Sequence, residues 1–214
     1  MIHLAVFSKI TRVQVQNDLA AAMGEPGAKV SKAETGKPFL KTSDGGKLGL
    51  SVSHVRRASS PLSFMAVTNR ADFAIDAESW PAHQESSAFL TSVMTMEDRP
   101  LVGKLASLMV DPAISLWAIK ESALKASGEV MNDPRHLSAT LSRNGHIWVD
   151  SSSNSSRPVP AAQVSLWKYI PDPSQPAILL ALAFVAWTGQ NPGETLPTLQ
   201  LVGTQGELQP LTLR

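Results

Sequence analysis

The sequence of 214 residues contains no cysteine. Disulfide bonds, a thiolate nucleophile and zinc sites with cysteine ligands are therefore excluded, and the absence is typical of a reducing compartment. The five histidines include no pair four residues apart, a spacing that zinc sites on helices use. Neither a disulfide framework nor a zinc motif is thus available to this chain.

Long hydrophobic runs are absent as well. The longest, residues 177–187, has 11 residues, whereas a membrane-spanning helix needs about 20. The N-terminal stretch MIHLAVFSKITR has too few apolar residues before its first charge to form the core of a signal peptide. We therefore expect a cytoplasmic protein without membrane contact.

A charge excess of one sign is also missing. The 19 lysines and arginines are balanced by 18 acidic residues, so the net charge is +1, and the basic residues are spread along the chain. This balance predicts neither nucleic acid nor an anionic membrane surface as a partner. A hydrophobic content of 43% is enough for a core, and the length fits one large domain or two small ones that share a core.

The sequence does contain short strand patterns mixed with a few helical ones, without a regular βαβ alternation, and this mixture predicts an α+β protein. Strands are expected at residues 1–7, 32–40, 48–55, 60–68, 73–78, 161–170 and 177–187, with a hairpin around Asn144-Gly145. Helices are expected at residues 12–24, over most of 83–110 with a break near Asp98, and from Asp111-Pro112 to Gly128. From Gln190 onward the composition suggests a loosely attached tail.

The helical segment SLWAIKESALKASG carries three charged residues in an otherwise apolar pattern, namely Lys120, Glu121 and Lys125. Trp117, Glu121 and Lys125 are four residues apart, so they share one face of the helix. A Glu/Lys pair at this spacing is common on exposed helix faces, and taken alone it predicts no more than that.

Two acidic residues share a face of an expected strand. Asp76 and Glu78 are two residues apart in the segment FAIDAE, so both carboxylates point to the same side. Two like charges on a half-buried strand need a counter-charge, and a hard cation such as Mg²⁺ is suitable. The alternative is a strand end that exposes both acids to water.

A third segment offers groups that bind phosphate. Ser53 and His54 end a strand pattern and precede Arg56 and Arg57, so hydroxyl, imidazole and guanidinium donors lie close together in sequence. Serine and histidine at a strand end are also typical of an ordinary turn.

In chain order, GKPFL at 36–40, SVSH at 51–54, IDAE at 75–78 and WAIKESALK at 117–125 resemble the marks of the 4'-phosphopantetheinyl transferases of the larger, Sfp-like (pseudodimeric) type. Those marks are a G-K-P segment, an S-H pair on a strand, a G-[IV]-D-[IV]-E strand and a W-x-x-K-E-[SA]-x-x-K helix. Ala74 replaces the usual glycine and Ala77 a bulkier apolar residue, but both carboxylates are retained.

The resemblance implies a pseudo-two-fold α+β fold. Its two similar halves would be residues 1–69 and 70–190, followed by the tail 191–214, with a coenzyme A site in the cleft between the halves. The implied protein is a monomeric, Mg²⁺-dependent enzyme. It would transfer 4'-phosphopantetheine from coenzyme A to a serine of an acyl or peptidyl carrier protein and release 3',5'-ADP.

The resemblance also implies roles for individual residues. Asp76, Glu78 and Glu121 would hold Mg²⁺. Glu121, directly or through a metal-bound water, would accept the proton of the carrier serine, and Lys125 would stabilise the departing ADP. The residues expected to bind coenzyme A are Arg12, with Lys9 as a further candidate, Lys37, Pro38, Ser53, His54, Lys120 and Lys125.

Two alternatives remain open at the level of sequence. One is a non-catalytic relative that binds coenzyme A or a carrier protein. The other is a structural α+β protein in which the motifs coincide by chance. Thermal stabilisation by coenzyme A with Mg²⁺ would separate the second alternative from the other readings. The sequence does not indicate which carrier or pathway is served.

Overall fold

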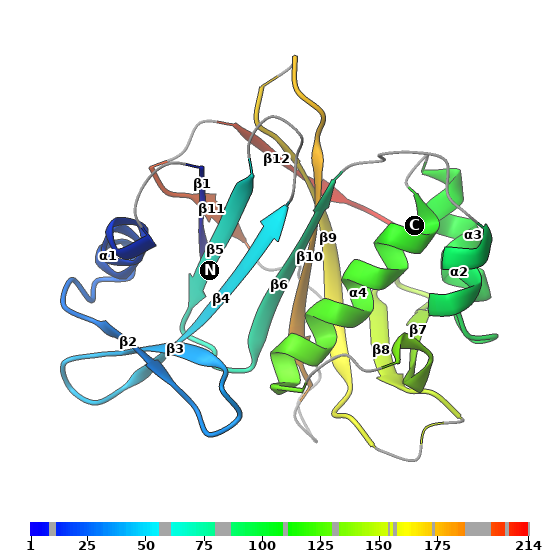
Figure 1. The fold of residues 1–214 in the computed structure, drawn as a ribbon, viewed down its shortest axis with the longest axis horizontal. Coiled ribbons are helices and arrows are strands. Elements are labelled where there is room, and N and C mark those ends of the chain that lie inside the picture. Colours follow the sequence, from blue (N-terminus) through cyan, green and yellow to red (C-terminus); the bar gives the residue numbers. More distant parts are fainter. Residues whose placement is uncertain are drawn as a thin grey trace.

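The structure is a computed structural model. It describes residues 1–8, 12–55, 61–79, 87–108, 111–129, 133–153, 155, 158–172, 174–186, 198–203 and 206–213. The described residues form two sheets that lie side by side, with helices packed on them (Figure 1). The prediction of an α+β protein is therefore confirmed. Among the described helices, none has the length and apolar character needed to cross a membrane.

The first sheet has the strand order β11-β1-β5-β4-β3-β2. Neighbouring strands are antiparallel, except that β1 and β11 are parallel. Helix α1 (Arg12–Ala22) packs on β1 and β5 through Val15, Leu19 and Ala20. The strands are β1 (Ile2–Phe7), β2 (Lys29–Lys32), β3 (Pro38–Lys41), β4 (Lys47–Val55), β5 (Leu62–Thr68) and β11 (Leu199–Leu201).

The second sheet has the order β6-β10-β9-β8-β7, and β12 pairs with β9 beside β8. Helix α4 packs on β6 and β10, and helices α2 and α3 pack on α4. The elements are β6 (Phe73–Ser79), α2 (Ser87–Val93), α3 (Arg99–Ser107), α4 (Pro112–Ser127), the short helix η1 (Pro134–His136), β7 (Leu137–Leu141), β8 (Ile147–Ser151), β9 (Ala162–Ile170), β10 (Ile178–Val185) and β12 (Glu207–Leu211).

The two sheets repeat one topology. In each sheet the first strand in sequence is followed by helix and then by four strands. The fifth strand returns to lie beside the first, which gives the orders 1-5-4-3-2 and 6-10-9-8-7. Residues 1–69 supply the first set of five strands and residues 70–190 the second.

Local signals in the sequence set the ends of α4. The carboxylate of Asp111 accepts hydrogen bonds from the N–H groups of Ala113 and Ile114, Pro112 occupies the first turn, and Gly128 ends the helix with a φ of 81°. The predicted start and stop of this helix are therefore confirmed. The predicted hairpin around Asn144-Gly145 also forms, with a positive φ at Gly145. A second hairpin joins β3 to β4, with a positive φ at Gly45.

Hydroxyl groups on β4 link the two sheets. Ser51 Oγ accepts a hydrogen bond from the Ile75 N–H, and Ser53 Oγ accepts one from the Ala77 N–H, both at 3.0 Å. These bonds hold β4 beside β6, and the two strands lie next to each other in Figure 1. Apolar side chains from both sheets, among them Phe64 of the first, form a shared core behind this contact.

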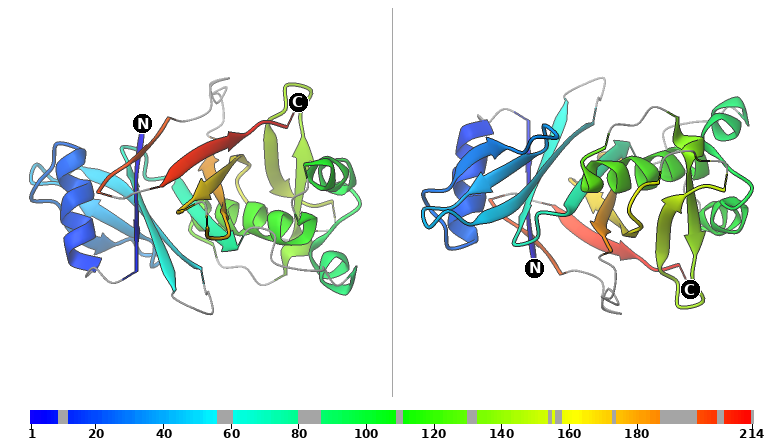
Figure 2. Two further views of the ribbon diagram at one scale, coloured as in Figure 1. Left: turned by 90° about the horizontal axis from the view of Figure 1, so that it is seen from above. Right: turned by 90° about the horizontal axis from the view of Figure 1, so that it is seen from below.

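The expectation of a loosely attached tail after residue 190 is wrong for the described part of that segment. Strand β11 extends the first sheet beside β1, and β12 lies against the second sheet (Figure 2). Leu199, Leu201 and Leu208 pack on the shared core, and Leu213 is buried in the second unit. The apolar residues of LQL alternate, but in ELQPLTL the leucines at 208 and 211 are three residues apart, and nearby glycine and proline further hide the pattern. Pro210 is tolerated because β12 is short and peripheral.

Candidate functional site

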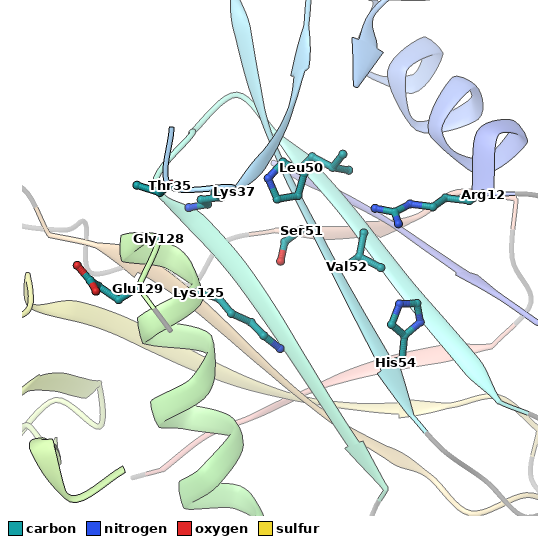
Figure 3. A pocket seen from close by; sticks show the side chains of 11 residues that line it. Arg12, Thr35, Lys37, Leu50, Ser51, Val52, His54, Lys125, Gly128 and Glu129 are labelled. Atoms are coloured by element: carbon teal, nitrogen blue, oxygen red, sulfur yellow. The ribbon is translucent and has the colours of Figure 1, made fainter. Parts of the chain in front are cut away.

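A cavity of about 360 Å³ opens between β4 and the C-terminal end of α4 (Figure 3). Basic side chains predominate among its charged groups, since Glu129 is the one acidic residue in the described lining. Five residues predicted from the sequence to bind coenzyme A line it together: Arg12, Lys37, Pro38, His54 and Lys125. These residues come from α1, the start of β3, β4 and α4, so the wall is formed by the first sheet with its helix α1 and by α4, which packs on the second sheet.

Lys37 connects the two walls of the cavity. Its Nζ donates a hydrogen bond of 2.6 Å to the carbonyl oxygen of Ala126, in the last turn of α4. Burial lowers the pKa of Lys37 to about 8, although the charge of Asp72 opposes this shift. A Cβ atom at Gly128 would meet the Thr35 hydroxyl at 3.1 Å, so the turn before β3 packs closely on the end of the helix. The β2–β3 turn therefore helps to fix the cavity's shape.

An acidic cluster adjoins the cavity, and Lys125 belongs to both. Asp76 Oδ1 accepts hydrogen bonds from Lys125 Nζ at 2.6 Å and from Ser53 Oγ at 3.1 Å. The same ammonium group lies 2.9 Å from Glu121 Oε1, one helical turn earlier on α4. Asp76 Oδ2 is buried and has no hydrogen-bond partner among the described residues. Lys125 thus joins β6 to α4 at the edge of the cavity.

The electrostatics of the cluster follow from burial and crowding. Burial raises the pKa of Asp76 above its ordinary value, with Lys125 opposing the shift. Burial, together with the charges of Asp76 and Glu121, raises the pKa of Glu78 to about 7. Burial lowers the pKa of Lys125, but the carboxylates of Asp76 and Glu121 outweigh burial and raise it overall. One ammonium group thus contacts two of the three carboxylates, and its charge also acts on the third, Glu78.

This donor set suits a hard cation such as Mg²⁺, which prefers carboxylate oxygens, and the unpartnered Asp76 Oδ2 is a buried oxygen that a cation would satisfy. In the described parts of the chain, however, no three acidic or histidine side chains are arranged as a ready-made metal site. The Lys125 ammonium lies between Asp76 and Glu121 instead. The metal role of Asp76, Glu78 and Glu121 therefore stays a prediction.

The raised pKa of Glu78 predicts a pH-dependent stability in the absence of divalent cations. The folded protein binds the Glu78 proton more tightly than the unfolded chain does, so the stabilisation is complete below the ordinary pKa of 4.5 and is lost as the pH rises through about 7. Because Glu78 is partly exposed, we expect a loss of about 1–2 kcal/mol in the free energy of unfolding.

Urea unfolding in chelator at several pH values measures this loss. Glu78→Gln should reduce the slope between pH 5 and 7, whereas Glu34→Gln, at an exposed position, should leave it unchanged. An unchanged slope in Glu78→Gln would contradict the assignment.

Two predicted coenzyme ligands lie elsewhere. Lys120 has no exposed surface, and its Nζ donates to Asp98 Oδ2 at 2.7 Å and to the Val93 carbonyl at 2.8 Å. A side chain enclosed in this way cannot touch a coenzyme, so the prediction for Lys120 is wrong. Ser53 is also buried, and its hydroxyl is used by Asp76 and by the backbone N–H of β6. Ser53 therefore positions Asp76 rather than lining the cavity.

Sequence reasoning missed Ser51, which lines the cavity and lies two residues before Ser53 on the same face of β4. The two-residue spacing of Ser51 and Ser53 on an expected strand is the signal by which Ser51 could have been predicted. His54 does line the cavity, and its Nδ1 is hydrogen-bonded to the Ser63 hydroxyl at 2.8 Å. Lys9, Arg56 and Arg57 fall outside the described residues.

A scan against protein-family models and a search of curated proteins both returned no match. The class of the protein therefore rests on its motifs and on the geometry of its site. That geometry combines a repeated sheet topology, a basic cavity and an acidic cluster that shares one lysine with the cavity.

Proposed function

We propose that this chain transfers 4'-phosphopantetheine from coenzyme A to a serine of an acyl or peptidyl carrier protein, with Mg²⁺, as do the pseudodimeric 4'-phosphopantetheinyl transferases that its motifs resemble. One observation carries the proposal: Lys125 both lines the basic cavity and binds two of the three acids. A diphosphate held in the cavity would therefore lie directly beside the acidic cluster. The repeated strand order of the two sheets supports the pseudo-two-fold fold that the resemblance implies.

The cavity suits the phosphate-bearing part of coenzyme A. Arg12, Lys37 and Lys125 supply positive charge, and His54 adds a ring nitrogen near them. A volume of about 360 Å³ lies within the range of roughly 300–1,000 Å³ that is usual for small-molecule sites.

In the proposed reaction, the carrier serine oxygen attacks the phosphorus that bears pantetheine. A P–O bond forms there while the P–O bond to 3',5'-ADP breaks. Glu121 accepts the serine proton, because its side chain is 24% exposed whereas Asp76 is only 4% exposed. Lys125 stabilises the negative charge that develops on the departing ADP. A bound Mg²⁺, held by Asp76, Glu78 and Glu121, would neutralise charge on the pyrophosphate.

The direct test is intact-mass spectrometry of an apo carrier protein incubated with this protein, coenzyme A and Mg²⁺. We expect a mass gain of one phosphopantetheine group with the wild type and none with Glu121→Gln, which keeps the size of the side chain but cannot accept the proton. Both an acyl and a peptidyl carrier should be tried.

The negative outcomes separate the alternatives. Thermal stabilisation by coenzyme A with Mg²⁺, but no transfer to either carrier, would favour a non-catalytic relative that binds the coenzyme. Absence of both transfer and stabilisation would contradict the proposal and favour a structural protein.

A further inference from the structure

The Lys125 ammonium lies between two of the three acids. It contacts Asp76 Oδ1 at 2.6 Å and Glu121 Oε1 at 2.9 Å, so it bridges two of the three carboxylates. A divalent cation bound by the same two carboxylates would have to occupy that position or lie next to a like charge. The ammonium group and a divalent cation therefore compete.

The Lys125 side chain can also move from the acids into the basic cavity. Its side chain is 33% exposed, lines the basic cavity and extends from α4 toward β4 (Figure 3). Four methylene groups give the ammonium a wide reach. Phosphate oxygens in the cavity would offer it new acceptors without any movement of α4.

The surroundings of Asp76 make that movement conditional. If Lys125 leaves, the Ser53 hydroxyl still holds Asp76 Oδ1, so the carboxylate keeps its orientation. The carboxylate would nevertheless be a buried charge without a counter-ion, which is costly. Lys125 can therefore leave at low cost only when another cation replaces it.

We propose that Lys125 is a displaceable counter-ion that makes divalent-cation binding and phosphate binding in this site depend on each other. Phosphate in the cavity draws the ammonium away and opens the acids to the divalent cation. The cation in turn frees the ammonium for phosphate, and the two effects are equal by linkage. The inference rests on the proposed function for the choice of coenzyme A as the phosphate ligand, but not for the competition itself.

The test is isothermal titration of Mg²⁺ into the protein without coenzyme A. Lys125→Met, which keeps the length of the side chain and removes its charge, should bind Mg²⁺ about tenfold or more tightly than the wild type. Lys29→Met, at an exposed position on β2, should bind Mg²⁺ as the wild type does. Equal affinities in the wild type and in Lys125→Met would overturn the inference.

A second measurement can overturn the inference with the wild type alone, so it remains informative even if Lys125→Met fails to fold. The affinity of the protein for coenzyme A is measured with and without Mg²⁺. The affinity of free coenzyme A for Mg²⁺ is measured separately, so that their complex in solution can be taken into account. The wild type should bind coenzyme A more tightly with Mg²⁺, and Lys125→Met should lose most of that difference. Affinity that is independent of Mg²⁺ in the wild type would overturn the inference. If Lys125→Met binds Mg²⁺ more tightly but the wild type transfers nothing to a carrier, the inference about Lys125 holds and the proposed function is wrong.

Discussion

Asp76→Asn is expected to lower the rate of phosphopantetheine transfer by about a hundred- to a thousand-fold, the usual cost of removing one preorganised electrostatic group. Asparagine keeps the size of the side chain and an oxygen that can accept the Ser53 hydroxyl bond. It removes the charge that pairs with Lys125 and the most buried of the three proposed metal ligands. The effect should therefore fall on the chemical step rather than on folding.

Initial rates measured by the mass gain of the carrier protein test this expectation, together with thermal unfolding of the variant. Asp150→Asn is the matched control, because Asp150 is an exposed acid on strand β8 of the same sheet. We expect both variants to unfold near the wild-type temperature and only Asp76→Asn to lose activity. Turnover by Asp76→Asn within a few-fold of the wild type would remove Asp76 from the site.

Lys120→Met is expected to lower the free energy of unfolding by about 3–5 kcal/mol, because it leaves a buried carboxylate without its counter-ion. Asp98 has no exposed surface, and its two oxygens also accept hydrogen bonds from the N–H groups of Thr95 and Ala139, each at 2.6 Å. The pair thereby ties α4 to the segment between α2 and α3 and to strand β7. Without the ammonium group, the buried charge of Asp98 would be uncompensated where these three segments meet.

Urea unfolding of Lys120→Met beside Arg135→Met isolates the effect of burial. Arg135 pairs with Asp133 at the surface, and exposed pairs contribute little to stability. Similar losses in the two variants would contradict the structural role of Lys120. A weaker affinity for coenzyme A with unchanged stability would restore Lys120 as a ligand.

Structural features that depend on residues close together in the sequence could be predicted. Asp111, Pro112 and Gly128 define the ends of α4 because capping depends on neighbouring backbone groups. The pairing of Lys125 with Glu121 follows in the same way from their spacing of four residues.

Contacts between distant segments could not be predicted in this way. Lys120 carries the same charge as Lys125 and lies in the same motif, and only the fold brings Asp98 to it. Likewise, only the side-by-side packing of β4 and β6 decides that Ser53 binds Asp76 while Ser51 lines the cavity.

The pairing of β11 with β1 also bears on the order in which the molecule can fold. Of the strands that the structure describes in the first sheet, five lie before residue 69, whereas β11 follows β6 to β10 of the second sheet in the chain. During synthesis, the edge of β1 that pairs with β11 therefore stays unpaired until the second unit has emerged from the ribosome. Pairing of β11 with β1 closes a loop of nearly the full chain length, which is slow. Because β12 follows β11 in the chain and pairs with β9, each sheet should receive its last strand late in folding.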